Sequence, residues 1–160
     1  RLGMNTPELV VEIGAGTAFF CIAFQRLFQG AKIYACDLSE VMLDWVKENV
    51  SDFYPNIIPQ KTKESEIPLE NDLADLVYMI NLHHELDNPH AILQESFRLL
   101  KPGGKLFIVD WKKQEMPEGP PEHIRCTAEE VSSQITSAGY YNVKVFEELS
   151  KHFLIIGEKR

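Results

Sequence analysis

The chain has 160 residues, which is enough for one domain with a buried core, and its 44% hydrophobic and 25% charged content is ordinary for a globular protein. A net charge of −8 argues against a protein that binds a nucleic-acid backbone, and no apolar run is long enough to span a bilayer. The three cysteines have no metal-ligand spacing, and two of them lie in apolar runs, which favours a reduced, cytoplasmic protein.

Strand-like and helix-like segments alternate along the chain, without repeats or linkers, so we treat residues 1–160 as a single domain. The first strand comes within ten residues of Arg1, so one option is that part of a longer natural N-terminus, including cap helices, is missing. We predict strands at Leu9–Ile13, Lys32–Cys36, Ile57–Pro59, Ala74–Ile80, Lys105–Asp110, Asn142–Glu148 and His152–Lys159. We predict helices at Thr17–Gln29, Ser39–Asn49, Asn88–Leu100 and Thr127–Gly139, and a loop at Lys112–Glu122.

Helix boundaries are marked by capping residues. Ser39 is a candidate N-cap, Asn88 followed by Pro89 is a good helix start, and Thr127 with Glu130 has the spacing of a capping box. The first five strands are joined by crossovers too long for hairpins, which indicates a parallel, doubly wound α/β sheet. The last two strands are separated by only a short link, so we expect an antiparallel hairpin there.

Polar residues follow the ends of the predicted parallel strands, where open α/β sheets bind their ligands. The first strand ends in Glu12 and a glycine turn, Gly14-Ala15-Gly16, which allows close approach of a ligand to the backbone. Asp37 ends the second strand, twenty-one residues after Gly16, where an acid can accept hydrogen bonds from both ribose hydroxyls. Turn and acid together predict an adenosine ligand.

The turn does not suit a dinucleotide. The third glycine of G-x-G-x-x-G is replaced by Phe19, whose ring would block a pyrophosphate. The shorter pattern G-x-G-x-G fits better, because its third glycine is replaced by Ala18, which is larger by only one methyl group. Glu12 would repel a pyrophosphate but suits a cationic amine, and S-adenosylmethionine carries an ammonium and a sulfonium and no phosphate.

These features resemble the class I S-adenosylmethionine-dependent methyltransferases, and the resemblance covers nearly the whole chain. The matching segments are Val11-Glu12-Ile13-Gly14-Ala15-Gly16-Thr17, Asp37-Leu38-Ser39 with Met42, Asp75-Leu76-Val77-Tyr78-Met79, and Leu99-Leu100-Lys101-Pro102-Gly103-Gly104-Lys105-Leu106. Within the family the chain looks most like the small-molecule branch that includes the ubiquinone/menaquinone-biosynthesis type. The resemblance implies a Rossmann-like sheet of seven strands, mostly parallel, with strand seven antiparallel.

The resemblance also implies roles for individual residues. Glu12, Gly14, Ala15 and Gly16 would line the methionine and ribose, Asp37 would hold the ribose hydroxyls, Leu38 and Met42 would pack against adenine, and Asn81 and Leu82 would flank the methionine. Many members have an Asp after strand three that meets the adenine amino group. The matching position here is Thr62, and the backbone at Lys63 could serve adenine as well.

The sulfonium already supplies the electrophile, so the protein mainly aligns an in-line displacement and removes a proton. His83, His84 and Asp110 are candidate bases, and His83 is preferred because the segment after strand four borders the methyl group in this fold. A metal site at His83-His84-Glu85 is disfavoured, since adjacent residues rarely converge on one ion. Trp111 is either a cover of the core or an aromatic wall for substrate.

The sequence therefore predicts methyl transfer to a small-molecule acceptor, without nucleic acid or a membrane span, and with a homodimer as one option for the assembly. The alternative is a module of the same fold that binds S-adenosylmethionine and catalyses nothing. A nicotinamide-linked oxidoreductase is disfavoured by Phe19 and Glu12. The acceptor itself cannot be read from the sequence, because substrate pockets in this fold are built from variable loops.

Overall fold

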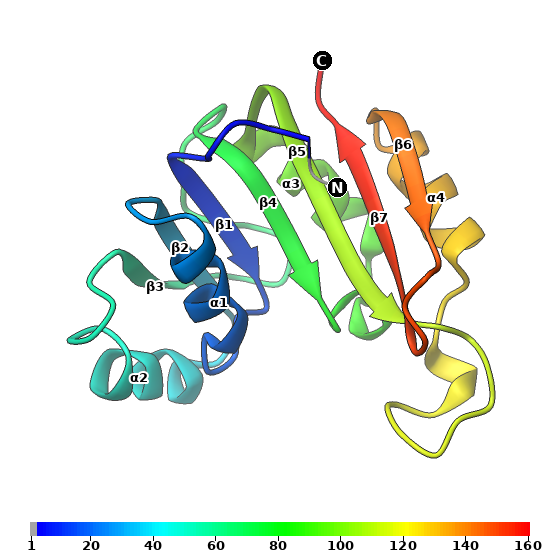
Figure 1. Cartoon of the computed structure of the whole chain (residues 1–160), viewed down its shortest axis with the longest axis horizontal. Coiled ribbons are helices and arrows are strands. Elements are labelled where there is room, and N and C mark those ends of the chain that lie inside the picture. The colour runs from blue at the N-terminus through cyan, green and yellow to red at the C-terminus, as the bar shows by residue number, and fades with distance from the viewer. Residues whose placement is uncertain (1–2) are drawn as a thin grey trace.

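The computed structural model describes residues 3–160, so the first two residues of the predicted domain lie outside it. It shows one sheet with helices on both faces (Figure 1). The strands are β1 Leu9–Ile13, β2 Lys32–Asp37, β3 Ile57–Lys61, β4 Ala74–Ile80, β5 Leu100–Trp111, β6 Tyr141–Phe146 and β7 His152–Glu158. The helices are α1 Phe19–Leu27, α2 Glu40–Asn49, α3 Pro89–Leu99 and α4 Ala128–Ser137, with 3-10 turns at His83–Glu85 and Glu122–Ile124.

The seven strands lie in the order β3-β2-β1-β4-β5-β7-β6. The first five are parallel, whereas β7 runs antiparallel to both β5 and β6, and Figure 1 shows its arrow opposed to its neighbours. The predicted doubly wound, Rossmann-like sheet with a C-terminal antiparallel hairpin is therefore confirmed. Strand order reverses between β1 and β4, so their carboxyl ends flank the switch point.

Strands β3 and β5 are both longer than the sequence predicted. β3 continues through Pro59 to Lys61, which is tolerated because β3 is an edge strand. β5 begins at Leu100 instead of Lys105, because the segment predicted as a helix stop joins the sheet. Leu100 pairs with Ala74, and the backbone of Gly103 and Gly104 exchanges hydrogen bonds with Lys159.

Helix boundaries follow the predicted caps. The side chains of Ser39, Asn88 and Thr127 accept hydrogen bonds from the first turns of α2, α3 and α4, and Thr127 forms a full capping box with Glu130. α1 starts at Phe19, later than predicted, because Ala18 adopts a left-handed conformation with φ 59°. An alanine in this conformation costs roughly 1–2 kcal/mol of free energy, whereas a glycine does not. The G-x-G-x-G motif has a glycine at this position.

The core lies in two layers, one on each face of the sheet. α1 and α2 cover one face, where Val10, Ile33 and Tyr78 are buried, and α3 and α4 cover the other, where Val77 and Ile108 are buried. Side chains alternate between the faces along each strand, so neighbouring strand residues belong to different layers. No helix within residues 3–160 combines the length and apolar character needed to cross a bilayer.

Candidate cofactor-binding site

A cavity of about 270 Å³ opens beyond the carboxyl ends of β1, β2 and β4, at the switch point of the sheet. Its lining consists of Ile13, Gly14, Asp37, Leu38, Thr62, Lys63, Glu64, Ile67, Asn81, Leu82, Glu85, Leu86 and Ile92. The structure thus brings Gly14, Asp37, Leu38, Thr62, Lys63, Asn81 and Leu82, all predicted cofactor contacts, to one cavity. It does not bring Glu12, Ala15, Gly16 or Met42 to that lining.

The backbone N–H groups of the glycine turn are already used within the protein. Gly14 and Ala15 both donate to the carbonyl oxygen of Cys36, at 2.9 and 3.0 Å, and Gly16 donates to Oδ2 of Asp37 at 2.7 Å. A phosphate-binding turn points such groups at its ligand. These three groups bond to Cys36 and Asp37 of β2 instead, which favours a ligand without phosphate.

Asp37 is held in one orientation at the end of β2. Its Oδ2 accepts from Gly16, and its Oδ1 accepts from the backbone of Ser39 at 2.8 Å. A carboxylate oxygen has two lone pairs, so each oxygen can accept a second hydrogen bond from a ligand diol. The carboxylate therefore lines the cavity in an arrangement that suits two vicinal hydroxyls.

Gly14 is a position where the backbone must come close to a side chain. A Cβ on Gly14 would lie 2.8 Å from both terminal methyl carbons of Leu82, and φ is +74°, in the left-handed region. We expect Gly14→Ala to lower the free energy of unfolding by roughly 1–2 kcal/mol from the backbone alone. It should also push Leu82 into the cavity and weaken the binding of S-adenosylhomocysteine.

Gly16→Ala is the matched control, because Gly16 also has a left-handed φ of +52° but has nothing within 4 Å of the added Cβ. Urea denaturation should show a similar loss of stability for both variants. Calorimetric titration should show the larger loss of affinity for Gly14→Ala. Equal affinities of both variants would mean that Leu82 does not border the ligand.

Glu12 points to the face of the sheet covered by α1 and α2 and does not line the cavity, and its place beside the methionine stays a prediction. It shares the face of Val10, because strand side chains alternate, and it is only 1% exposed. Its Oε2 accepts hydrogen bonds from the thiol of Cys21 at 2.7 Å and the hydroxyl of Tyr78 at 2.9 Å. Burial raises the pKa of this carboxyl to about 7, against the opposing effect of both hydrogen bonds.

Ala15, Gly16 and Met42 do not line the cavity. Ala15 is buried, Gly16 orients Asp37, and Met42 is exposed on α2. Thr62 is buried, and its backbone donates to the carbonyl oxygen of Asp37 at 3.1 Å, which ties the two walls of the cavity together.

One wall of the cavity was not foreseen from the sequence. The connection 62–73 between β3 and β4 supplies Glu64 and Ile67, and it is fixed to α3 by Glu95 and Arg98. Glu95 accepts from the backbone of Ile67 at 2.7 Å, and Arg98 donates to the carbonyl oxygens of Ile67 and Leu69 at 2.9 and 2.8 Å. The only sign of this attachment in the sequence was the spacing of Glu95 and Arg98, three residues apart on a predicted helix. Such pairs are common on exposed helix faces, so the spacing does not predict the attachment.

His83 does not line the cavity. It is 1% exposed, and its Nε2 lies 2.7 Å from Oε1 of Gln134 on α4. Burial lowers the pKa of its imidazole, which keeps it neutral. The adjacent His84 is the residue that meets Asp110. Trp111 packs beneath the loop after β5, where a Cβ on Gly119 would lie 2.7 Å from its ring.

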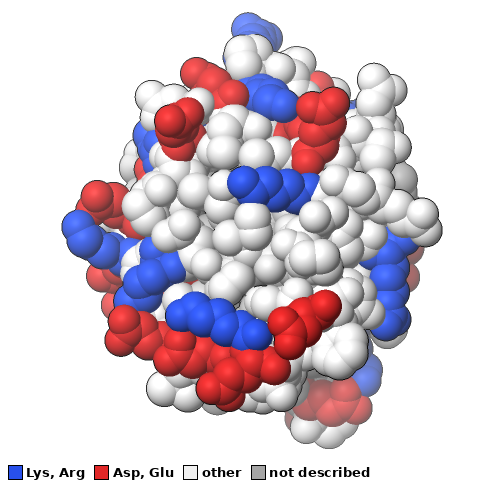
Figure 2. All heavy atoms as spheres, turned by 90° about the vertical axis from the view of Figure 1, so that its left-hand side faces the viewer, with Lys and Arg blue, Asp and Glu red and all other residues white. Residues whose placement is uncertain are grey.

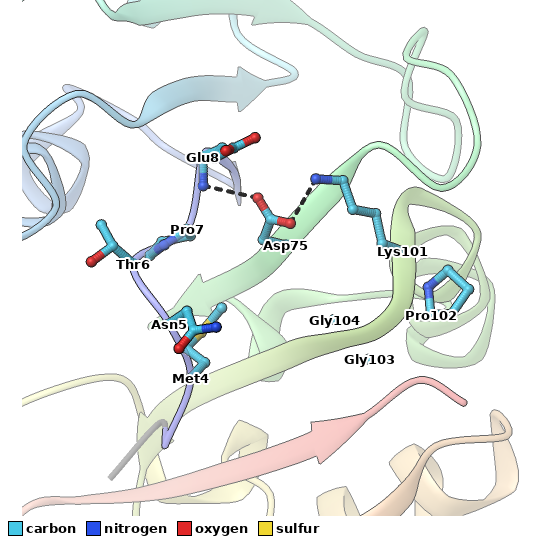
Figure 3. A pocket seen from close by; sticks show the side chains of 10 residues that line it. All are labelled: Met4, Asn5, Thr6, Pro7, Glu8, Asp75, Lys101, Pro102, Gly103 and Gly104. Carbon is cyan, nitrogen blue, oxygen red and sulfur yellow. Dashed lines mark hydrogen bonds and ion pairs between the residues drawn. The ribbon is translucent and has the colours of Figure 1, made fainter.

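A second cavity, of about 320 Å³, lies at the opposite edge of the sheet, lined by residues 4–8 and the start of β5 (Figure 3). Its central acid, Asp75, accepts from the backbone of Glu8 and Leu9 at 2.9 Å and from Lys101 at 2.7 Å. These contacts pin the N-terminal segment to β4 and β5. The acid is thereby engaged in holding the fold together.

An open sheet whose cavity lies at the switch point beyond the strand ends defines a cofactor-binding α/β domain. Residues 11–108 match the family described as "Methyltransferase domain". The structure is similar to a SAM-dependent methyltransferase from Aquifex aeolicus, with a TM-score of 0.90 and 30% identity over 98% of this chain and 84% of that one.

Two curated relatives are also described as methyltransferases or methyltransferase-like. A methyltransferase-like protein of Schizosaccharomyces pombe is 32% identical over 114 residues, covering 70% of this chain and 41% of that protein. The ubiquinone/menaquinone biosynthesis C-methyltransferase of Proteus mirabilis is 26% identical over 115 residues, covering 69% of this chain and 45% of that protein. This chain belongs to the S-adenosylmethionine-dependent methyltransferase family, and it spans less than half the length of these two relatives.

Proposed function

We propose that this chain binds S-adenosylmethionine in the cavity at the switch point and transfers its methyl group to a small-molecule acceptor. The observation that carries this proposal is the placement of Asp37 and of Asn81 with Leu82 on the walls of one cavity. Asp37 would hold the ribose, and the segment after β4 would border the methionine.

The residues present fit this cofactor. Leu38 and Ile67 supply apolar walls for an adenine ring, and the N–H groups of the glycine turn are engaged internally, as suits a ligand without phosphate. Asn81 has φ 56°, and its buried Oδ1 has no hydrogen-bond partner among the described residues. A buried polar atom without a partner is costly, and an ammonium donor nearby would satisfy it.

When bound, the sulfonium supplies a methyl group that is already activated for displacement. The protein's part is to fix the ribose at Asp37, to exclude water with the apolar side chains of Leu82, Leu86 and Ile92, and to align the acceptor. This geometry supports methyl transfer better than hydride transfer, because a nicotinamide dinucleotide would need the turn's N–H groups for its pyrophosphate.

A small-molecule acceptor is supported by the net charge of −8 and by the similarity to the biosynthetic C-methyltransferase of Proteus mirabilis. Figure 2 shows that, on the side bearing α2 and β3, Lys and Arg lie among Asp and Glu side chains and form no continuous basic surface. A cytoplasmic location and a homodimer stay predictions.

Calorimetric titration with S-adenosylmethionine, S-adenosylhomocysteine and NAD tests the proposal. We expect the first two to bind and NAD not to bind. Binding of NAD alone would overturn it. Binding of S-adenosylmethionine without methyl transfer to any member of a broad acceptor panel would favour the non-catalytic module.

Asp37→Ala should weaken S-adenosylhomocysteine binding by about 1–3 kcal/mol, the scale of hydrogen bonds lost to a charged group. Asp44→Ala is the control, because Asp44 is an exposed acid on α2 that pairs with Lys47 and does not line the cavity. Titration calorimetry measures both affinities, and thermal unfolding checks that the variants are folded. An affinity unchanged by Asp37→Ala would place the ribose elsewhere.

A further inference from the structure

Another cavity adjoins the cofactor cavity at the same edge of the sheet. Its volume is about 300 Å³, and it shares six lining residues with the cofactor cavity, namely Leu38, Glu64, Leu82, Glu85, Leu86 and Ile92. Ser65, Asp87 and Asn88 line this cavity and not the cofactor cavity. We call it the vestibule. Leu82 borders the methionine in the proposed binding mode, so an occupant of the vestibule would lie beside the reacting end of the cofactor.

The vestibule has an apolar floor, formed by Leu38, Leu82, Leu86 and Ile92. Ile92 is 3% exposed and belongs to the core under α3 and α4, and Leu82 and Leu86 pack against that core. The backbone of Leu86 also donates to the carbonyl oxygen of His83 at 3.3 Å, which closes the 3-10 turn. The floor is therefore part of the packed interior, and free energy is gained when the apolar part of a ligand covers it.

An exposed apolar stripe continues from the vestibule along α2. Leu38, which lines the vestibule, immediately precedes the N-cap of α2 and is 53% exposed. Val41 and Trp45 are 74% and 44% exposed, and they lie four residues apart on one face of the helix, with Met42 next to them. We call these four residues the α2 stripe. Exposed apolar side chains in a row are typical of surfaces that bind apolar groups.

Acids dominate the charged side chains of the vestibule. Glu64, Glu85 and Asp87 line it, and no described Lys or Arg does. None of the three acids forms an ion pair with Lys or Arg within residues 3–160. Lys63, which lines the cofactor cavity, is paired with Glu66 at 2.8 Å. The vestibule is therefore a region of negative potential, which attracts a cation and repels an anion.

The polar groups assigned to the cofactor lie outside the vestibule. Asp37, Thr62 and Asn81 line the cofactor cavity and do not line the vestibule. The vestibule is thus left for a second molecule when the cofactor is bound, and the shared Leu82 brings that molecule next to the methionine. A methyl acceptor needs this placement, since the reacting atoms must approach to about 3–3.5 Å before transfer.

We propose that the vestibule and the α2 stripe form the acceptor subsite, and that this subsite takes a cationic amphiphile, a molecule with an apolar body and a positive charge. This inference rests on the proposed function. The apolar body would cover Leu86 and Leu38 and extend toward Trp45, and the positive charge would lie among the three carboxylates. An anionic molecule of the same length would be repelled.

The first test measures binding to the protein loaded with S-adenosylhomocysteine. The probes are decyltrimethylammonium, tetramethylammonium and decyl sulfate, each below its micelle concentration. Decyltrimethylammonium should bind at least about 10-fold more tightly than either of the others, because only this probe has both the chain and the positive charge. Titration calorimetry gives the affinities. The fluorescence of Trp45, identified by comparison with Trp45→Phe, should change only when a decyl probe that reaches α2 is bound.

The second test separates the apolar and the charged parts of the subsite. Val41→Ser should weaken the binding of decyltrimethylammonium by about 5-fold, because apolar contact is lost. Asp87→Asn should weaken it by about 3-fold and should strengthen the binding of decyl sulfate. Both residues are exposed and neither lines the cofactor cavity, so S-adenosylhomocysteine affinity should stay within about 2-fold.

Matched controls use exposed positions away from the subsite. Phe53→Ser is the control for the apolar variant, because Phe53 is 79% exposed beyond the opposite end of α2 and lines neither cavity. Glu48→Gln, on the last turns of α2, is the control for the acid. Neither control should change the affinity of any probe by more than about 2-fold.

Each other outcome counts against one part of the proposal. Displacement of S-adenosylhomocysteine by decyltrimethylammonium would show that the vestibule belongs to the cofactor site, and binding of none of the probes would show that it is no subsite. Equal affinities for the two ammonium probes would reject the apolar body, and equal affinities for the two decyl probes would reject the charge preference. Absence of S-adenosylhomocysteine binding in the unaltered protein would instead overturn the proposed function.

Discussion

Glu12→Gln should raise the free energy of unfolding by about 3 kcal/mol above pH 7, and by little near pH 4. Glu12 is 1% exposed, and burial raises its pKa from 4.5 to about 7. A folded-state pKa above the unfolded value means that the protonated carboxyl stabilises the fold below about pH 4.5. That stability is lost as the pH rises through about 7. The rise in pKa from 4.5 to about 7 means that the free energy of unfolding is about 3 kcal/mol lower with Glu12 ionised than with Glu12 protonated.

Glutamine has the size of the protonated acid, and its amide oxygen can still accept from Cys21 and Tyr78. Urea denaturation of both proteins between about pH 4 and 8 gives the difference in free energy at each pH. Glu48→Gln, at an exposed position on α2, is the matched control and should give a flat difference. A flat difference for Glu12→Gln as well would show that the carboxyl does not change its charge in this range.

Arg125→Met should lower the free energy of unfolding by about 2–4 kcal/mol, because it removes the anchor of the loop after β5. Arg125 is 3% exposed, although its guanidinium has no carboxylate partner within residues 3–160. It donates to the carbonyl oxygens of Lys112, Gln114, Glu118 and Pro120. Without it, these acceptors must be hydrated or left unpaired.

Arg125→Lys should not restore stability, because the single ammonium of lysine cannot reach all the carbonyl oxygens that surround the planar guanidinium of arginine. Arg26→Met is the control, because Arg26 is exposed and its guanidinium donates to a single side chain among the described residues, that of Tyr54. We expect that control to change stability by less than about 1 kcal/mol. Trypsin should cleave faster at Lys112 and Lys113 when Arg125 is replaced. Full rescue by lysine, or unchanged proteolysis, would mean that the loop does not depend on the guanidinium.

Local sequence signals were enough to predict the fold. Capping residues, apolar runs and glycine turns act over a few residues, which is why Ser39, Asn88 and Thr127 start helices as predicted. Strand ends likewise predicted that Gly14 and Asp37 meet at one cavity, because parallel strands share a carboxyl edge.

Other features depend on contacts between distant parts of the chain. Ile67 reaches the cavity through Glu95, twenty-eight residues further along, and no local pattern encodes that contact. The surroundings of His83 and His84 depend on a 3-10 turn, which directs the His83 ring to Gln134 on α4 and the His84 ring to Asp110 on β5. The direction of Glu12, by contrast, follows from strand alternation and was available from the buried Val10 two positions earlier.

The anchor of the loop after β5 has an evolutionary consequence. Arg125 contacts main-chain oxygens, which every residue type possesses, and none of the loop's side chains takes part in these bonds. Most residues of 112–124, with the exception of Gly119 against Trp111, can therefore change identity while the path of the loop is preserved. A segment that follows β5 at its carboxyl end and can vary in chemistry but keep its shape would let related proteins acquire new substrates without rebuilding their scaffold.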